Sequence, residues 1–326
     1  RSTSVRISVS TSNSLKMSLN RLQIQVATGR FTFPVVIFVC LLLWVIGFQK
    51  WNELVSLAIV VSIGYTIIET NTTFNLIRTR SSLPVCIYGW IATSLFFLHP
   101  LEWTNIVPLL YILAIYQLFL SYESASPVYS IFHAFFFISL GSLILPQFMI
   151  FTLLWWLSMI PFRAMSIKSF CASLIGLITP YWFLFTYAFY MDEMHHFLSP
   201  LQEMIHFYPI NYSLLTPTEI ISVIVITLML LISGFHYWQI AFMDKTRTRI
   251  YLFFLVYSGW WTTLLLALQP VHLHTWMPIQ LICTAFLNGH LFSLTRNKFS
   301  GILFFVTFIA YISLMLFNLW MQSFNS

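Results

Sequence analysis

The chain has 326 residues, of which 59% are hydrophobic, 18% are aromatic and only 7% are charged, and its formal net charge is +6. A soluble domain typically carries about 25% charged residues, so this composition excludes a water-soluble globular protein. Nucleic acid is excluded as a partner because the Lys and Arg residues stand at the ends of apolar stretches instead of sharing one face. The partner that the composition predicts is membrane lipid.

Residues 1–30 form a basic segment that is rich in Ser and Thr and holds no acidic residue. We expect this segment to be a disordered tail. An acid-poor, Ser- and Arg-rich leader is typical of an organellar transit peptide, but a translated stretch upstream of a start at Met17 explains the same residues more simply. Residues 31–326 are then a single transmembrane domain.

Long apolar stretches follow the tail. A helix that crosses a bilayer needs about 20 mainly apolar residues, because the hydrocarbon core is about 30 Å thick. Eleven segments meet or approach this length, and we therefore predict an all-α, polytopic transmembrane helix bundle. In chain order the segments are 31–48, 54–69, 84–99, 106–122, 128–144, 146–161, 169–190, 218–238, 249–268, 274–293 and 299–320.

Residues 128–161 fit two descriptions: one long helix bent at Pro146, or two short helices joined by a turn there. One helix of this length would extend about 51 Å at 1.5 Å per residue, well beyond the hydrocarbon core. It would also move Arg163 and Lys168 to the side opposite the other basic residues. We therefore predict two helices.

The basic residues orient the bundle, because cytoplasmic loops carry an excess of Lys and Arg. With eleven crossings and the amino end in the cytoplasm, only Lys50 falls outside. The carboxyl end then lies on the outer side of the membrane, opposite the cytoplasm. The basic residues predicted to lie inside are Arg21, Arg30, Arg78, Arg80, Arg163, Lys168, Lys245, Arg247, Arg249, Arg296 and Lys298.

Few side chains inside the predicted spans carry chemistry. The cysteines lie within apolar stretches and lack CxxC or CxxH spacing, so we interpret all four as buried packing thiols. The histidines within the spans are expected to be neutral and hydrogen-bonded between helices. These residues are Cys40, Cys86, Cys171 and Cys283, and His133, His236 and His290.

The longest stretch between predicted spans, residues 191–217, faces outward. Its apolar residues recur every three or four positions, a spacing that predicts an amphipathic helix lying in the outer membrane interface. Pro200 should break or bend this helix. The stretch also carries two Glu-x-x-His pairs, Glu193 with His196 and Glu203 with His206.

Such pairs are the ligand unit of di-iron sites in helix bundles. One hypothesis is therefore a metal or proton-coupled site, with Asp192, Glu193, His196, Glu203 and His206 as its residues. The alternative is an interfacial helix with solvated charges, because the positive-inside bias alone sends acidic residues outward. Other groups predicted on the outer face, which could complete a site, are Glu53, His99, Glu102, Glu219, His272 and His274.

Several short motifs lie between Arg78 and Tyr190. They are Arg78-Thr-Arg80 before Leu83-Pro84, Leu140-Gly141-Ser142-Leu143 before Pro146, Trp155-Trp156, and Gly176-Leu-Ile-Thr-Pro180-Tyr181. In these motifs the chain resembles an uncharacterised multi-pass membrane protein family of Bacteroidota, a domain of unknown function sometimes mislabelled as a carotene monooxygenase. The resemblance covers about a third of the chain and implies a location in the inner membrane of a Gram-negative cell. It supplies no catalytic residues, and the family's basic cluster between the fourth and fifth spans is missing here.

A phosphate-binding glycine loop, an HExxH zinc pair and a GxSxG nucleophile elbow are all missing from the sequence. The favoured hypothesis is a non-catalytic component, either a transport or permeation unit for a lipidic or small substrate or a subunit of an envelope assembly with other membrane subunits. The alternative is a membrane-embedded, metal-dependent enzyme, an oxidase or a lipid-linked transferase, that uses the outer His and Glu residues. The sequence does not assign a cofactor.

Overall fold

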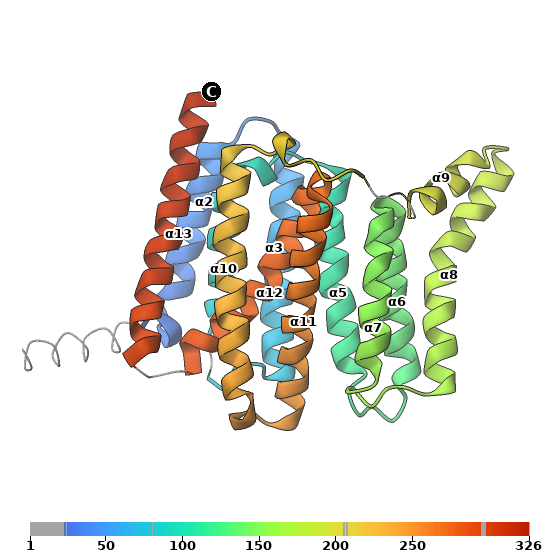
Figure 1. The fold of residues 1–326 in the computed structure, drawn as a ribbon, viewed down its shortest axis with the longest axis horizontal. Helices are drawn as coiled ribbons and strands as arrows, with labels where there is room; N and C mark the ends of the chain where they lie inside the picture. Colours follow the sequence, from blue (N-terminus) through green and yellow to red (C-terminus); the bar gives the residue numbers. More distant parts are fainter. Residues whose placement is uncertain are drawn as a thin grey trace, which may run out of the picture.

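A computed structural model describes residues 23, 25–79, 81–204, 206, 208–294 and 298–325. Within these ranges every regular element is an α-helix or a short 3-10 helix, and no strand occurs. Figure 1 shows the helices lying side by side in one bundle. The predicted all-α class is confirmed.

Each of the eleven predicted segments contains a helix. Eight of the described helices, extended by adjoining 3-10 turns, are long and apolar enough to cross a membrane, and α2, α4 and α7 are shorter. The helices are α2 (Thr32–Gly47), α3 (Glu53–Phe74), α4 (Leu83–Ser94), α5 (Val107–Leu120), α6 (Pro127–Ile144), α7 (Phe151–Met159), α8 (Ile167–Tyr190), α10 (Pro217–Ile240), α11 (Thr246–Leu268), α12 (Leu273–Leu294) and α13 (Lys298–Asn325).

Successive helices run in alternate directions between two ends of the bundle, which we name the upper and lower ends after their places in Figure 1. Contacts between connecting segments show which of them share an end. At the lower end, Arg78 after α3 pairs with Asp244 after α10, and Arg163 after α7 pairs with Glu123 after α5. At the upper end, Glu102 before α5 contacts His274 at the start of α12.

The chain reverses at Pro146, so the prediction of two helices there is confirmed. Leu145 adopts an extended backbone conformation and Pro146, which has no N–H to donate, begins the 3-10 helix η3 (Pro146–Ile150) that leads into α7. The end of α6 packs tightly on this turn, since a Cβ atom on Gly141 would lie 2.7 Å from Cδ1 of Phe148.

Helix α12 is the most buried helix of the bundle. In the most apolar stretch of residues 270–294, which contains α12, 89% of the residues are buried. Its polar side chains bond to neighbouring helices. Nε2 of Gln280 donates to the hydroxyls of Thr227 at 3.0 Å and Thr263 at 2.8 Å, and Nδ2 of Asn288 donates to the Tyr311 hydroxyl at 2.7 Å. Hydrogen bonds of this kind associate helices in lipid, where apolar burial alone supplies little driving force.

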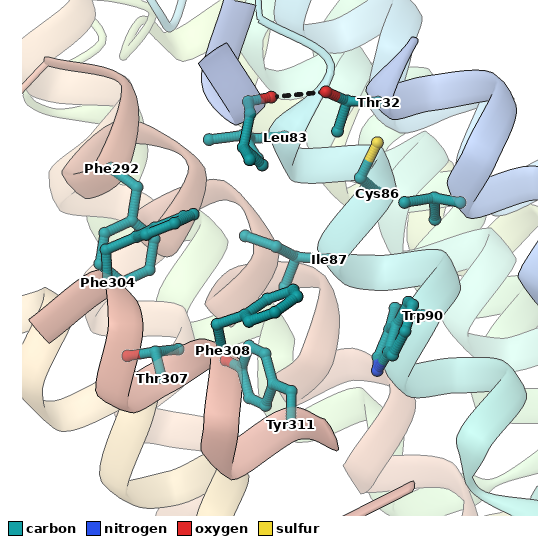
Figure 2. Close-up of a pocket in the computed structure, with 12 residues that line it drawn as sticks. Thr32, Leu83, Cys86, Ile87, Trp90, Phe292, Phe304, Thr307, Phe308 and Tyr311 are labelled. Carbon is teal, nitrogen blue, oxygen red and sulfur yellow. Dashed lines mark hydrogen bonds between the residues drawn. The ribbon is translucent and has the colours of Figure 1, made fainter. Parts of the chain in front are cut away.

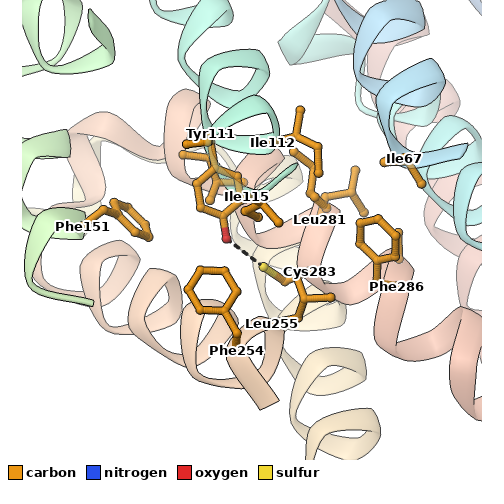
Figure 3. Close-up of a cluster of buried hydrophobic side chains, with 14 of the residues drawn as sticks. Ile67, Tyr111, Ile112, Ile115, Phe151, Phe254, Leu255, Leu281, Cys283 and Phe286 are labelled. Carbon is orange, nitrogen blue, oxygen red and sulfur yellow. Dashed lines mark hydrogen bonds between the residues drawn. The ribbon is translucent and has the colours of Figure 1, made fainter. Parts of the chain in front are cut away.

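The largest apolar cluster packs α5, α7 and α11 against α12. Figure 3 shows the Tyr111 ring among Phe151, Phe254 and Leu255, with its hydroxyl pointing at Cys283. The hydroxyl lies 3.1 Å from the Cys283 sulfur. Cys283 and Cys86 are buried packing thiols as predicted, and all four cysteines are free. Cys171 is exposed, so the expectation of a buried thiol is wrong at this position, because α8 lies at the edge of the bundle (Figure 1).

Exposed apolar side chains surround the bundle. On α8 the exposed fractions of Trp182 and Phe183 are 63% and 68%, and Phe305 on α13 is 47% exposed. A soluble protein rarely leaves such extensive apolar surface in water. This surface requires lipid as its solvent.

The last residues of the segment that is expected to be a disordered tail are ordered in the structure. Residues 25–28 are helical, and Ala27 is buried against the bundle. The hydroxyl of Ser81 donates to the Ala27 carbonyl at 2.7 Å, and this contact orders the end of the segment. The disorder predicted for residues 1–22 and for residue 24 lies outside the described residues.

Candidate functional site

The predicted amphipathic helix is present as α9 (His195–Glu203), beside the upper end of α8 (Figure 1). Phe197 packs edge-on against Phe185 of α8, with ring centroids 5.3 Å apart. Pro200 lies inside α9, and the helix continues past it to Glu203 instead of breaking.

The residues predicted to bind a metal do not gather into a site. Asp192 adopts a left-handed backbone conformation, with φ of 57°, in the turn that ends α8. Nε2 of His196 lies 2.9 Å from a carboxylate oxygen of Glu193, and both side chains are about half exposed. The backbone carbonyl of Glu203 accepts from Nε2 of Gln147 at 3.3 Å and from the N–H of His206 at 3.1 Å.

Across the described part of the chain, no group of three or more His, Cys, Asp or Glu residues could hold a metal ion. The structure thus joins Glu193 with His196 and does not bring the five predicted residues together. The metal site stays a prediction, and no assembled ligand set supports it.

A different upper-end group is assembled, from Glu102, Glu219 and His274. Thr216 caps α10 and forms a capping box with Glu219, whose carboxylate accepts the Thr216 N–H at 2.8 Å. Nε2 of His274 lies 2.7 Å from the same carboxylate, and its Nδ1 lies 3.4 Å from Glu102. Both ring nitrogens face carboxylates, which leaves His274 without a free nitrogen for a metal.

Beside this group lies the upper-end cavity, which has a volume of about 200 Å³. It lies between the end of α2, the start of α3, the segment around the 3-10 helix η1 (Phe96–Leu98), the first turn of α10 and the last turns of α13. Its lining residues are Gly47, Gln49, Glu53, Phe96, Phe97, His99, Pro100, Thr218, Asn318, Met321 and Gln322.

Three residues that line this cavity have buried polar atoms without a hydrogen-bond partner. Asn318 is only 4% exposed, and neither its amide oxygen nor its amide nitrogen has a partner. Oε1 of Gln322 and Nδ1 of His99 are likewise unpartnered. Each buried polar atom that lacks a hydrogen bond lowers the stability of the folded protein by about 1–3 kcal/mol, because it has lost its hydration. These atoms have almost no accessible surface, so they lie behind the cavity wall, and unpartnered polar atoms of the same kind occur elsewhere in the bundle.

The position of His99 depends on close packing by α2. The His99 ring stacks on Trp44 with centroids 3.9 Å apart, and its Nε2 lies 3.2 Å from the Thr93 carbonyl oxygen. Gly47 leaves the necessary space, since a Cβ atom there would lie 2.9 Å from Nδ1 of His99 and 2.6 Å from Cδ1 of Phe96.

Glu53 supplies the carboxylate in the cavity wall. Its oxygens accept the backbone N–H groups of Gln49 at 3.1 Å and Lys50 at 3.2 Å, which fixes the turn between α2 and α3. Glu53 is 4% exposed. The turn therefore holds an acidic group at the buried side of the cavity.

A second cavity, the apolar crevice, lies between α2, α4, α12 and α13 and has a volume of about 80 Å³. Figure 2 shows Phe304 and Phe308 on one side of it and Ile87 and Trp90 on the other. Among its described lining residues there is no charged side chain, and the hydroxyls of Thr32, Thr307 and Tyr311 already bond to other groups of the protein.

The lower end carries a charge pair in which the carboxylate is buried and the guanidinium is half exposed. The Asp244 carboxylate contacts the Arg78 guanidinium at 2.7 Å and Nε2 of His290 at 2.9 Å. Burial raises the pKa of Asp244, but the hydrogen bond to His290 and the Arg78 charge oppose this effect, and the net pKa lies below its ordinary value. His290 thus bonds between segments as expected, whereas His133 bonds the Tyr129 carbonyl of its own helix.

Sequence reasoning identified Glu53 and His99 as outer-face groups but missed Asn318 and Gln322. Their signal was present: they are polar amides four residues apart, so they share one face of the last apolar helix. Tyr311 and Leu314 continue the same buried face. Neither amide is ionisable, so charge patterns along the chain do not single them out.

The fold, the lipid-facing surface and the two polar ends define a helical, multi-pass membrane protein. Comparison of the chain with family models, with curated proteins and with solved structures finds no match.

Proposed function

We propose that the protein is a non-catalytic permeation unit that binds a small polar solute in the upper-end cavity. The observation that carries this proposal is the upper-end cavity itself, which has a volume of about 200 Å³ and is lined by the carboxylate-bearing Glu53 together with the polar residues Gln49 and Thr218. A few polar groups in an otherwise apolar wall orient a bound solute.

The proposed membrane arrangement has eleven crossings, with the amino end in the cytoplasm and the carboxyl end outside. Support comes from the alternating direction of the helices and from the gathering of Arg78, Arg163 and Arg247 at the lower end. The lower end then faces the cytoplasm and the upper-end cavity faces outward. The resemblance to the Bacteroidota family supports the inner membrane as the location.

The proposed route for the solute follows α12. Gln280, Thr284 and Asn288 recur every four residues and therefore form one polar stripe on the most buried helix. The stripe lies between His274 at the upper end and His290 at the lower end. In the present conformation its side chains are engaged in hydrogen bonds, so solute passage requires these bonds to exchange.

Swelling of proteoliposomes tests the proposal. Liposomes with the purified full chain are exposed to isosmotic glycerol, propylammonium chloride or sodium propionate, and solute entry is followed by light scattering. We expect at least one solute to enter faster than into protein-free liposomes, and Asn318→Trp, which fills the cavity, to abolish the difference. Equal entry with and without protein, or full activity of Asn318→Trp, would refute the proposal.

A membrane-embedded enzyme is the second candidate, favoured by the placement of His274 between two carboxylates, as in an acid–base group. Metal analysis separates the metal-dependent version from the permeation unit. Purified wild type is compared with a variant in which four residues, Glu193, His196, Glu203 and His206, are replaced by Ala. Negligible and equal metal content is expected for a permeation unit, and stoichiometric metal lost in the variant would favour the enzyme.

A further inference from the structure

The apolar crevice is elongated along two helices. Its lining residues extend from Leu83 to Trp90 on α4 and from Phe304 to Tyr311 on α13. Each of these stretches covers about 10 Å at 1.5 Å per residue. Transmembrane helices tilt on average only about 20° from the bilayer normal. The crevice therefore points in the direction that lipid chains take in a bilayer.

The crevice is open at the side of the bundle. Phe308 on one wall is 46% exposed, and Ile87 and Val36 are half-buried. Its floor is closed, since Leu83 and Phe292 are buried. Helices α2 and α13 each pack on α4 but contact each other little. In the most apolar stretch of α13 only 22% of the residues are buried, so lipid surrounds this helix and reaches the crevice beside it.

The chemistry of the walls suits a hydrocarbon ligand. The three hydroxyl groups that line the crevice are engaged within the protein, and the ring nitrogen of Trp90 has almost no accessible surface. An enclosed apolar cavity of about 150 Å³ stays dry and binds benzene. With a volume of about 80 Å³, the crevice has room for a slim chain but not for a ring.

A basic side chain lies near the lower end of the crevice. Val26 and Thr32 line this end, and Arg30, which stands between them in the sequence, is exposed. A guanidinium group binds phosphate through paired N–H groups, and basic sites on the cytoplasmic side of transmembrane helices bind lipid head groups. Arg30 thus complements the charge of a phospholipid whose chain enters the crevice from this end.

From these features we infer that the apolar crevice binds one acyl chain of a phospholipid, which comes from the leaflet at the lower end and has its phosphate at Arg30. The chain fills a gap whose walls otherwise lack dispersion contacts. The inference is independent of the proposed function, because the described residues that line the crevice and the upper-end cavity are different.

Photo-labelling of the purified full chain in liposomes tests the inference. The liposomes contain phosphatidylglycerol with a diazirine on one acyl chain, and mass spectrometry locates the labelled residues after irradiation. We expect Trp90 and Phe308 to be labelled at least fivefold more than Trp182 and Phe183 of α8, which are 63% and 68% exposed to lipid. Equal or weaker labelling in the crevice would overturn the inference.

Filling the crevice should displace the chain. Ile87→Trp should lower the labelling of Phe308 at least fivefold and keep the melting temperature, because the larger side chain occupies the space of the ligand. Ile175→Trp is the matched control, since Ile175 is 59% exposed on α8 and lies outside the crevice. If Ile87→Trp does not fold, Val36→Trp decides. Wild-type labelling in these crevice variants, or an equal loss in Ile175→Trp, would overturn the inference.

The phosphate contact has its own test. Arg30→Gln should lower the labelling of Phe308 by phosphatidylglycerol at least threefold without a change in melting temperature. Lys168→Gln is the control, because Lys168 is another exposed basic residue of the lower end but lies at the start of α8. Equal labelling of Arg30→Gln and Lys168→Gln would overturn the placement of the phosphate at Arg30.

Discussion

His274 lies 2.7 Å from Glu219, and this contact joins the first turn of α12 to the first turn of α10. The side chain of Glu219 is only 10% exposed, and it also forms the capping box that begins α10. A single carboxylate thus starts one helix and holds a second helix against it.

Replacement of His274 should therefore destabilise the upper end. Because a hydrogen bond to a charged group contributes about 1.5–3 kcal/mol, we expect His274→Ala to lower the free energy of unfolding by about that amount. Glu102→Gln is the control, since Glu102 is half exposed and lies 3.4 Å from His274, and it should cost less than about 1 kcal/mol. Unfolding in detergent measures both, and equal losses would contradict this ranking.

The lower-end carboxylate predicts a dependence of stability on pH. The pKa of Asp244 is lowered in the folded protein, so its interactions stabilise the fold above the unfolded pKa of about 3.9. This contribution is lost as the pH falls through the lowered folded pKa. Asp244→Asn should therefore be less stable than wild type at neutral pH.

The stability difference between wild type and Asp244→Asn should begin to shrink as the pH falls below about 4, where Asp244 of the unfolded chain takes up a proton, and should be smallest below the lowered folded pKa, where the folded carboxyl is neutral as well. Urea unfolding of both proteins at neutral and at acidic pH measures it. A difference that stays constant or grows on acidification would show that the Asp244 charge does not stabilise the fold.

The contact between α6 and α8 predicts that Gly176 does not tolerate a side chain. A Cβ atom there would lie 2.5 Å from the backbone oxygen of Phe132, and a backbone atom cannot rotate away as a side chain can. We expect Gly176→Ala to cost about 1–3 kcal/mol through overpacking, measured by thermal unfolding in detergent.

Gly64→Ala provides the comparison, because a Cβ atom at Gly64 would meet only Cγ2 of Val85, at 3.5 Å. This variant should be neutral or stabilised by up to about 1 kcal/mol, since alanine favours helix more than glycine does. A tolerated Gly176→Ala would mean that α6 and α8 do not approach as closely as described.

The helices could be predicted from the sequence because each one depends on local composition. The turn at Pro146 was also predictable, since a proline and a length limit act on neighbouring residues. By contrast, the helix at residues 25–28 was not predictable, because Ala27 packs against Leu83 and Leu291 and accepts a hydrogen bond from Ser81, all of which are distant in sequence.

The candidate site was less predictable for the same reason. The three-residue spacing of Glu193 and His196 predicts that their side chains lie close together, and in the structure they are in contact. The groups that meet at the upper end are distant in sequence: His274 is 55 residues from Glu219 and 172 residues from Glu102. Sequence placed these three on one predicted face, but only helix packing determines that they touch.

Reporter fusions test the membrane arrangement, on which the outward-facing cavity depends, most directly. A reporter that is active only outside the cytoplasm is fused after Thr104, at the upper end, and after Arg163, at the lower end. We expect activity after Thr104 and none after Arg163, with the reverse for a reporter that is active only in the cytoplasm. Both fusion points on the same side of the membrane would contradict the arrangement.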